Sequence, residues 1–424
     1  MQFKRTLLPN GLRVITIPMP SLESATVIVM VGAGSRYENK ANNGISHFFE
    51  HMAFKGTEKR PSAMEISSLI DGIGGEFNAF TGKEITGYYI KSAKGKLETL
   101  LDLLSDMLQN SKLDPVEIDK ERGVIMEEIN MIEDNPMRKL GDIYEELMYG
   151  DTPMGWDIAG PKENIQTITQ QNFRDYMGGL YSADNMTVVV AGGIESEPTE
   201  TLVEKYFGGM KQFITGNPVG IVENQTKPAV FIKTKKTEQI HIALGVRTIS
   251  LKSPKKYPLS VLAAILGGGM SSRLFHEVRE KRGLAYYIRT NSDEYTDAGT
   301  LVSTAGIDPK RVVEAIEVIL SEYKKVGEGK MELSDKELTK AKEFLKGHLV
   351  LGLEDSNSVA GFYGHQELLE EEIENPDQIL AHLDAVTKED VEAVGREFFI
   401  ENTLNLALIG NFEDRQKLES LLKL

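Results

Sequence analysis

Two histidines and a glutamate stand together in the stretch His47-Phe48-Phe49-Glu50-His51. If this stretch is helical, the two imidazoles are four residues apart and leave the same face of the helix, about 40° from alignment. Imidazoles spaced in this way can hold a zinc ion, and Glu50 can take a proton from a water on that ion without being a ligand. A chance pattern is disfavoured because the chain has only seven histidines among 424 residues. The stretch therefore predicts a zinc site that needs a third ligand from elsewhere.

The third ligand is expected on a helix that begins at Asp114 and Pro115, an N-cap residue followed by proline at the first helical position. On a helical wheel, Glu121 and Glu128 project within about 20° of each other at the edge of an apolar stripe, whereas Glu127 points to the solvent side. Glu128 is therefore the preferred ligand. Glu121 lies two turns away, about 10 Å along the axis, so we expect it to orient a ligand by hydrogen bonding instead of binding the metal.

The elements around these residues alternate between strands and helices. Apolar and β-branched residues predict a strand pair within 6–17, a buried strand at 25–31 and further strands at 74–79 and 85–90. Apolar residues at helical spacing follow a capping box formed by Ser62 and Glu65, and they recur at 97–108. This order of elements predicts an α+β fold.

The second half of the chain repeats the first. Residues 168–173 match 386–391 and residues 186–192 match 404–410 at an offset of 218, and residues 113–118 match 333–338 at an offset of 220. Two structurally similar α/β-sandwich domains are therefore expected. Glycine and proline without periodicity mark the linker between them. We predict a zinc-binding domain at 1–210, a linker at 211–226 and a second repeat at 227–424.

The second repeat lacks the metal-ligating residues. In the alignment of the two copies, His47, Glu50 and His51 face Val261, Ala264 and Ile265, and Glu128 faces His348. The second copy carries instead three consecutive glycines at 267–269. They lack a G-x-G-x-x-G or Walker pattern, so nucleotide binding is disfavoured, and we expect them to permit a turn or a close backbone approach.

Composition narrows the class of protein. An apolar content of 41% and a charged content of 26% are ordinary for a folded soluble protein, and no apolar run approaches the roughly 18 residues of a membrane span. The N-terminus leads into a strand-like segment and not into an apolar signal core, so a cytoplasmic location is expected. The absence of cysteine excludes disulfides and thiolate ligands. A net charge of -16 argues against nucleic-acid binding and favours attraction of cationic substrates.

With these residues assembled, the chain resembles the pitrilysin, insulysin and mitochondrial processing peptidase superfamily of zinc peptidases, and in particular its small bacterial members. The likeness covers essentially the whole chain. It rests on residues 47–51, which have the inverted zinc-peptidase order H-x-x-E-H, on Glu121 and Glu128, on residues 74–79 and on residues 272–286.

The resemblance implies a fold, an activity and a site. It implies two similar domains per chain and two chains, expected here as a homodimer, that close like a clamshell around a chamber for peptides. It implies Zn²⁺ on His47, His51 and Glu128, with Glu50 as the catalytic base and Glu121 outside the ligand shell. It further implies that Arg279 and Tyr286 bind the peptide substrate.

The expected chemistry follows from the residue types. Zinc held by two imidazoles and one carboxylate lowers the pKa of a bound water towards about 7 and polarises the scissile carbonyl. Glu50 takes the proton of that water and passes it to the leaving amine. The substrate backbone is expected to add as a strand along the edge formed by Phe77, Asn78 and Ala79, so that Asn78 and Ala79 bind the peptide. In a homodimer, Arg279 and Tyr286 of one subunit are expected to face the zinc residues of the other.

Two alternative functions belong to other classes. A non-catalytic scaffold of the same fold would be expected to have lost ligands or base, and all of them are present in this sequence. A partner-dependent subunit would supply the zinc residues while another chain supplied the arginine and tyrosine. This alternative is less favoured because both sets occur in this chain.

Overall fold

The strands predicted near the N-terminus belong to a six-stranded sheet in the computed structural model, which describes residues 2–370 and 372–424. The strands are β1 (Lys4–Leu7), β2 (Arg13–Pro18), β3 (Ser24–Val31), β4 (Glu76–Thr81), β5 (Thr86–Ala93) and β6 (Met186–Gly192), in the order β1-β2-β6-β3-β5-β4. β2 and β6 are parallel, and the other neighbours are antiparallel. Among the strands of the described residues, β4 pairs only with β5, so its other edge has no strand beside it.

A second sheet repeats this arrangement with five strands. They are β7 (Ala229–Thr234), β8 (Ile240–Arg247), β9 (Ala285–Glu294), β10 (Gly299–Ile307) and β11 (Leu404–Gly410), in the order β7-β11-β8-β10-β9. β7 and β11 are the parallel pair, and β9 takes the edge position that β4 has in the first sheet. The predicted α+β fold with two similar copies is confirmed, and β1 is an addition of the first copy.

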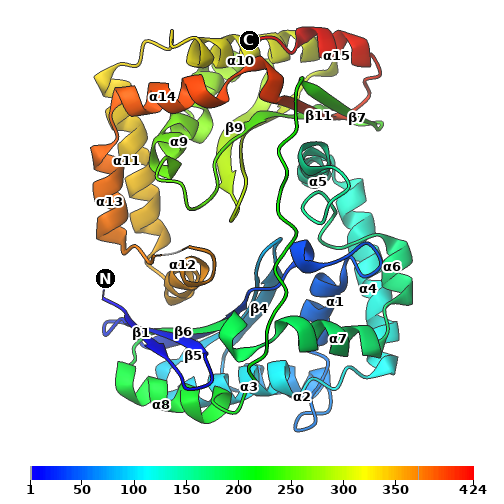
Figure 1. The fold of residues 1–424 in the computed structure, drawn as a ribbon, viewed down its shortest axis with the longest axis vertical. Coiled ribbons are helices and arrows are strands. Elements are labelled where there is room, and N and C mark those ends of the chain that lie inside the picture. Colours follow the sequence, from blue (N-terminus) through cyan, green and yellow to red (C-terminus); the bar gives the residue numbers. More distant parts are fainter. Residues whose placement is uncertain (1, 371) are drawn as a thin grey trace. The chain divides into compact units, whose positions relative to one another are not determined.

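Helices cover both sheets (Figure 1). The first copy contains α1 (Ile45–Met52), α2 (Ala63–Gly72), α3 (Leu97–Gln109), α4 (Pro115–Asp134), α6 (Lys162–Thr167), α7 (Gln170–Leu180) and α8 (Ser196–Phe207). The second contains α9 (Lys256–Ala263), α10 (Val312–Gly327), α11 (Asp335–Gly352), α13 (Pro376–Ala385), α14 (Lys388–Phe398) and α15 (Arg415–Leu421). Short π-helical turns lie at 264–268 and 275–280. The leucines of α3 are buried, which accounts for the predicted apolar stripe.

Two helices are exchanged between the copies. Helix α5 (Pro136–Tyr149) follows the first-copy helix α4, yet it packs on β11, β8 and β7 of the second sheet. Helix α12 (Ser356–Leu369) follows the second-copy helix α11 and packs on β3, β6 and β2 of the first sheet (Figure 1). Apolar residues make both contacts: Leu140 and Ile143 pack with Ala243 and Ala407, and Val359 and Tyr363 pack with Ile28 and Met30.

The exchange makes the compact units discontinuous in sequence. One unit consists of Met1–Asn130, Trp156–Val219 and Gly352–Asn375, and the other of Met131–Gly155, Gly220–Leu351 and Pro376–Leu424. This division differs from the predicted continuous domains, 1–210 and 227–424, by the two exchanged segments. The boundary between the units at 219–220 falls inside the predicted linker at 211–226, where the structure has neither helix nor strand.

Backbone details repeat with the sequence. Helices α7 and α14 both begin with a capping box, formed by Thr169 with Asn172 and by Thr387 with Asp390. The exchanged helices are also capped alike, since Asn135 and Asp355 each accept two backbone N–H groups of the helix that follows. These matches lie at the offsets of 218 and 220 that the sequence showed, so the repeat extends to the hydrogen bonds that begin the helices. No helix in the described part of the chain has the length and apolarity needed to cross a bilayer.

Candidate zinc and catalytic site

The stretch with both histidines is helical, as predicted, and forms α1. Gly44, the N-cap residue that precedes the helix, has a φ of 101°. A Cβ at this position would lie 2.6 Å from the Ala159 carbonyl oxygen, so larger residues are excluded. The buried carboxylate of Glu38 lies below this N-terminus and accepts hydrogen bonds from the backbone N–H groups of Gly44 (2.8 Å) and Ser46 (2.7 Å) and from the amide of Asn43. Glu38 thus supplies the acceptor that no N-cap side chain provides.

Helix α4 brings Glu128 to the two histidines. Its Oε2 is 3.5 Å from Nε2 of His47 and 3.5 Å from Nε2 of His51. The ligand atoms of the three residues all lie within 4.8 Å of one another, and they are the only such group among the residues described. Glu127 is exposed, on the solvent side that the helical wheel predicts. The structure therefore brings together the three predicted ligands.

The geometry of these atoms fits zinc. Imidazole nitrogen and carboxylate oxygen bind zinc at about 2 Å, so ligands at the corners of a tetrahedron lie about 3.3 Å apart. The observed 3.5 Å between the carboxylate oxygen and each imidazole nitrogen is close to that spacing. Burial, together with the neighbouring His51, lowers the pKa of His47 to about 4. Burial also acts to lower the pKa of His51, but the hydrogen bonds to Glu121 and Glu128 raise it to about 9, so a metal ion that binds this ring must displace a proton.

Glu121 lies behind His51, as predicted for a residue that orients a ligand. Its Oε1 is 2.8 Å from Nδ1 of His51, and its Oε2 is 2.5 Å from Nζ of Lys55. Burial alone would raise the pKa of Glu121, but the hydrogen bonds from His51 and Lys55 lower it. An ionised carboxylate can only accept, so Nδ1 of His51 carries the hydrogen and Nε2 faces Glu128.

The candidate base, Glu50, is held from the edge strand β4. The hydroxyl of Thr81, the last residue of β4, donates a hydrogen bond of 2.6 Å to Oε2 of Glu50. Burial raises the pKa of Glu50 above its ordinary value. A carboxylate with a raised pKa is a stronger base than one in water, which suits proton transfer near neutral pH.

The predicted peptide-binding residues Asn78 and Ala79 lie on β4, whose outer edge is open. The side-chain oxygen of Asn78 accepts a hydrogen bond of 2.9 Å from the backbone N–H of Ala79. Phe77 and Phe80 of the same strand are 36% and 39% exposed. An open strand edge of this kind can pair with an extended peptide through main-chain hydrogen bonds.

The other two predicted peptide-binding residues lie together in the second unit. The guanidinium of Arg279 is 4.7 Å from the ring centre of Phe275 and 5.9 Å from that of Tyr286. Tyr286, on the edge strand β9, is 75% exposed. The triple glycine nearby allows the close approach expected of it, because a Cβ on Gly267 would lie 2.3 Å from the backbone nitrogen of Thr290 in β9.

The metal positions of the first copy are apolar in the second. Val261, Ala264 and Ile265 are buried in the core of the second unit. His348, which corresponds to Glu128, is exposed and its Nδ1 contacts the Phe344 carbonyl at 2.8 Å. The second unit carries instead a cavity of about 320 Å³ between α5 and the strands β9 and β10, lined by the four tyrosines Tyr144, Tyr149, Tyr287 and Tyr295 among other residues.

Three contacts at the site were not predicted. Thr81 binds Glu50 from a strand whose register the sequence does not reveal, and Glu38 reaches α1 from a loop. Lys55 contacts Glu121. This contact could have been predicted in part, because Lys55 stands four residues after His51 and helical spacing would place the two side chains side by side.

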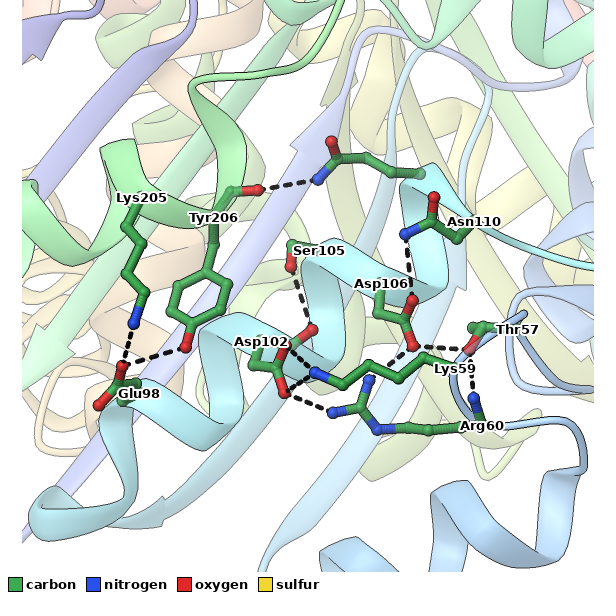
Figure 2. Close-up of polar contacts among 11 residues, drawn as sticks. Thr57, Lys59, Arg60, Glu98, Asp102, Ser105, Asp106, Asn110, Lys205 and Tyr206 are labelled. Carbon is green, nitrogen blue, oxygen red and sulfur yellow. Dashed lines mark hydrogen bonds and ion pairs between the residues drawn. The ribbon is translucent and has the colours of Figure 1, made fainter.

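The segment that follows α1 is fastened to α3 by a polar cluster (Figure 2). Arg60 donates to Asp102 and Asp106 at 2.5 Å each, and Thr57 donates to Asp106 at 2.6 Å. Lys59 pairs with Asp102 at 2.7 Å on the exposed side of the cluster. These contacts hold the chain just after α1, the helix that carries His47 and His51.

Two family models match the chain. Residues 13–162 match the model described as insulinase, peptidase family M16, and residues 167–345 match the model described as peptidase M16 inactive domain. The second match extends over the positions at which the repeat has Val261, Ala264 and Ile265 in place of the metal-ligating pattern.

Individual relatives match over nearly their whole lengths. An uncharacterized zinc protease of Streptomyces coelicolor is 37% identical over 419 residues, 97% of this chain and 90% of the relative. The zinc protease YmxG of Bacillus subtilis is 37% identical over 409 residues, 96% and 98% of the two chains. The beta subunit of the mitochondrial-processing peptidase of Saccharomyces cerevisiae is 32% identical over 95% of this chain and 90% of its own. The crystal structure of a protease from Helicobacter pylori superposes with a TM-score of 0.89 at 25% identity, covering 96% and 99%.

Proposed function

Because the chain belongs to the insulinase family of peptidases, peptidase family M16, we propose that it is a zinc-dependent endopeptidase that hydrolyses unfolded peptides. One observation carries the proposal: His47, His51 and Glu128 converge with zinc-like spacing, and Glu50 stands on the same helix turn. Membership of the family supports peptide-bond hydrolysis as the reaction. The three ligands and the neighbouring glutamate support zinc and a general base as its means.

Each residue has a separate role in the proposed reaction. Zinc, when bound by the three ligands, supplies an acidified water and polarises the scissile carbonyl. Glu50 accepts the proton of the attacking water and returns it to the leaving amine. Thr81 fixes Oε2 of Glu50, which leaves Oε1 to exchange the proton. Glu121 holds the ring of His51 in the orientation that presents Nε2.

The open edge of β4 indicates the form of the substrate. A peptide that pairs with Asn78 and Ala79 must be extended, and its carbonyls would then follow the strand that ends at Thr81, beside Glu50. Unfolded peptides meet this requirement and folded proteins do not. Because main-chain hydrogen bonds recur along any peptide, little sequence preference is expected.

We also propose that the working unit is a homodimer that closes around the peptide. Arg279 and Tyr286 of one subunit would then hold the substrate carbonyl near the zinc residues of the other, which gives two sites per dimer. Co-expression of a Glu50→Gln chain with an Arg279→Ala chain tests this arrangement. A mixed dimer has one intact site if the residues are shared across subunits, so about half of the wild-type activity should return. Isolated mixed dimers as inactive as the parents would contradict the sharing.

The principal experiment is an assay of the purified chain on a quenched unfolded peptide. Cleavage that is lost on chelation and restored by stoichiometric zinc would support the proposal. The relative in Saccharomyces cerevisiae is named as a subunit, so the alternative is a chain that acts only with a partner. Zinc binding without cleavage by the isolated chain would favour that alternative.

A further inference from the structure

Lys55 contacts the carboxylate that faces His51 from behind. Its Nζ is 2.5 Å from Oε2 of Glu121, while Oε1 of the same carboxylate is 2.8 Å from Nδ1 of His51. Glu121 is buried, with 5% of its surface exposed, whereas 26% of the Lys55 side chain is exposed. The ammonium thus reaches from the surface to a buried carboxylate that touches a candidate metal ligand.

The end of α1 sets the position of Lys55. The helix ends at Met52, and the backbone N–H groups of Phe54 and Lys55 donate to the carbonyls of His51 and Met52. This turn keeps Lys55 beside the helix that carries the histidines. The contacts of Arg60 with α3 then fix the chain a few residues further on (Figure 2).

The two contacts of Glu121 define the orientation of its carboxylate. A carboxylate with one fixed oxygen can still turn about its last bond, but a partner on each oxygen removes that freedom. With Oε2 on Lys55, Oε1 stays on His51. The positive charge also offsets one of the negative charges that Glu121, Glu128 and Glu50 bring to the site, which lowers the cost of burying Glu121.

We propose that Lys55 is a positioning residue for metal binding. It holds Glu121 against Nδ1 of His51, so that the ring keeps Nε2 turned towards His47 and Glu128. This inference rests on the function proposed above and adds a residue that touches neither metal nor substrate. Removing a group that hydrogen-bonds a ligand directly typically weakens metal binding by roughly 10- to 100-fold, and Lys55 acts one contact further out through Glu121, so we expect the lower end of that range.

The test compares three variants of the full chain. Lys55→Met removes the charge and keeps the aliphatic stem, and Lys55→Arg keeps the charge. Lys59→Met is the matched control, because Lys59 forms an ion pair of 2.7 Å with Asp102 of α3, a carboxylate that is not part of the candidate metal cluster (Figure 2). The zinc affinity of each metal-free chain is measured by competition with a chromophoric chelator, and kcat and KM are measured on the peptide.

We expect Lys55→Met to bind zinc roughly tenfold more weakly, Lys55→Arg to stay within a few-fold of wild type, and Lys59→Met to be unchanged. At saturating zinc, Lys55→Met should lower kcat and leave KM nearly unchanged. Thermal unfolding of the metal-free chains checks that the variants are folded, and Lys55→Gln replaces the methionine variant if that chain does not fold.

Two results would overturn the proposal without touching the proposed function. One is wild-type zinc affinity in folded Lys55→Met, and the other is an equal loss of affinity in Lys59→Met. If the wild-type chain itself bound no zinc, the proposed function would fail, and the role of Lys55 in metal binding would fail with it.

Discussion

Helices α1 and α9 occupy corresponding places in the two copies, and they differ in what they carry. The first places His47 and His51 beside a carboxylate of α4. The second turns Val261 into the core of its unit, and Ile265 of the π-helical turn that follows is buried there too. Apart from the additional strand β1, the strand order and the capping boxes are nevertheless the same in both copies. The scaffold therefore does not need the metal site in order to fold, and substitutions in the site should cost function far more than stability.

The largest expected effect separates chemistry from metal binding within the first copy. Glu50→Gln should lower kcat by at least about 10³-fold, because it removes the general base. Zinc content and the thermal midpoint should stay near wild type, since Glu50 is not among the clustered ligand atoms. Activity assays with metal analysis check this. A variant that lost its zinc would show that Glu50 is a ligand.

The next effect concerns Glu128 of α4, for which α11 has His348 in the corresponding place. Glu128→Gln should lose most of its zinc at equilibrium, since the substitution removes the anionic ligand of three. Glu127→Gln is the control and should retain zinc, because Glu127 is exposed one position away. Equilibrium dialysis followed by metal analysis distinguishes the two variants. The opposite pattern would exchange the roles of these neighbours.

The unfolding free energy should depend more on the buried residues of the second copy than on the histidines of the first. In metal-free chains, Ile265→Ala should cost about 3 kcal/mol of unfolding free energy, because Ile265 is buried in the second core. His51→Ala should cost only about 1 kcal/mol, because the ring lies at a partly exposed site. Denaturant unfolding gives both values. Equal losses would mean that His51 contributes to the stability of the first unit as much as Ile265 does to that of the second.

A pH-dependent effect concerns the start of α1. Neither α1 nor α9 is capped by the side chain of its N-cap residue, but Glu38 accepts from the N-terminus of α1, and burial raises the pKa of Glu38 to about 7. The unfolded carboxyl ionises near 4.5 and the folded one near 7, so the stabilisation from this group is complete below about 4.5 and is lost as the pH rises to about 7. The loss amounts to roughly 3 kcal/mol.

Glu38→Gln should remove this dependence. The stability difference between wild type and variant should therefore shrink as the pH rises from about 4.5 to 7, in favour of wild type at the acidic end. Unfolding of the metal-free chains at several pH values measures it. A difference that stays constant across this range would show that Glu38 is ionised at its position below the helix throughout.

Helical periodicity explains why part of the site could be predicted. The spacing of His47 and His51, and the choice of Glu128 over Glu127, follow from 3.6 residues per turn once the segments are helical. Contacts between distant segments do not follow from any local period. Thr81 reaches Glu50 only because β4 ends where it does.

The exchanged helices also show that a local sequence pattern does not identify a packing partner far away in the chain. The amphipathic faces of α5 and α12 predict that each is buried against something, and they do not identify the sheet. The repeat alone favoured continuous domains, whereas the structure assigns 131–155 to one unit and 352–375 to the other. At these two helices, the neighbours in sequence and the neighbours in space belong to different units.

The exchange also means that each half of the chain carries a part the other half is missing. If the gene were split within the linker at 219–220, the first product would hold α5 without its sheet, and the second would hold α12 without its own. Each product would expose an apolar face that only the other can cover. The two products should therefore reassemble when made together, which co-purification with one tagged half would reveal, and either half made alone should be insoluble.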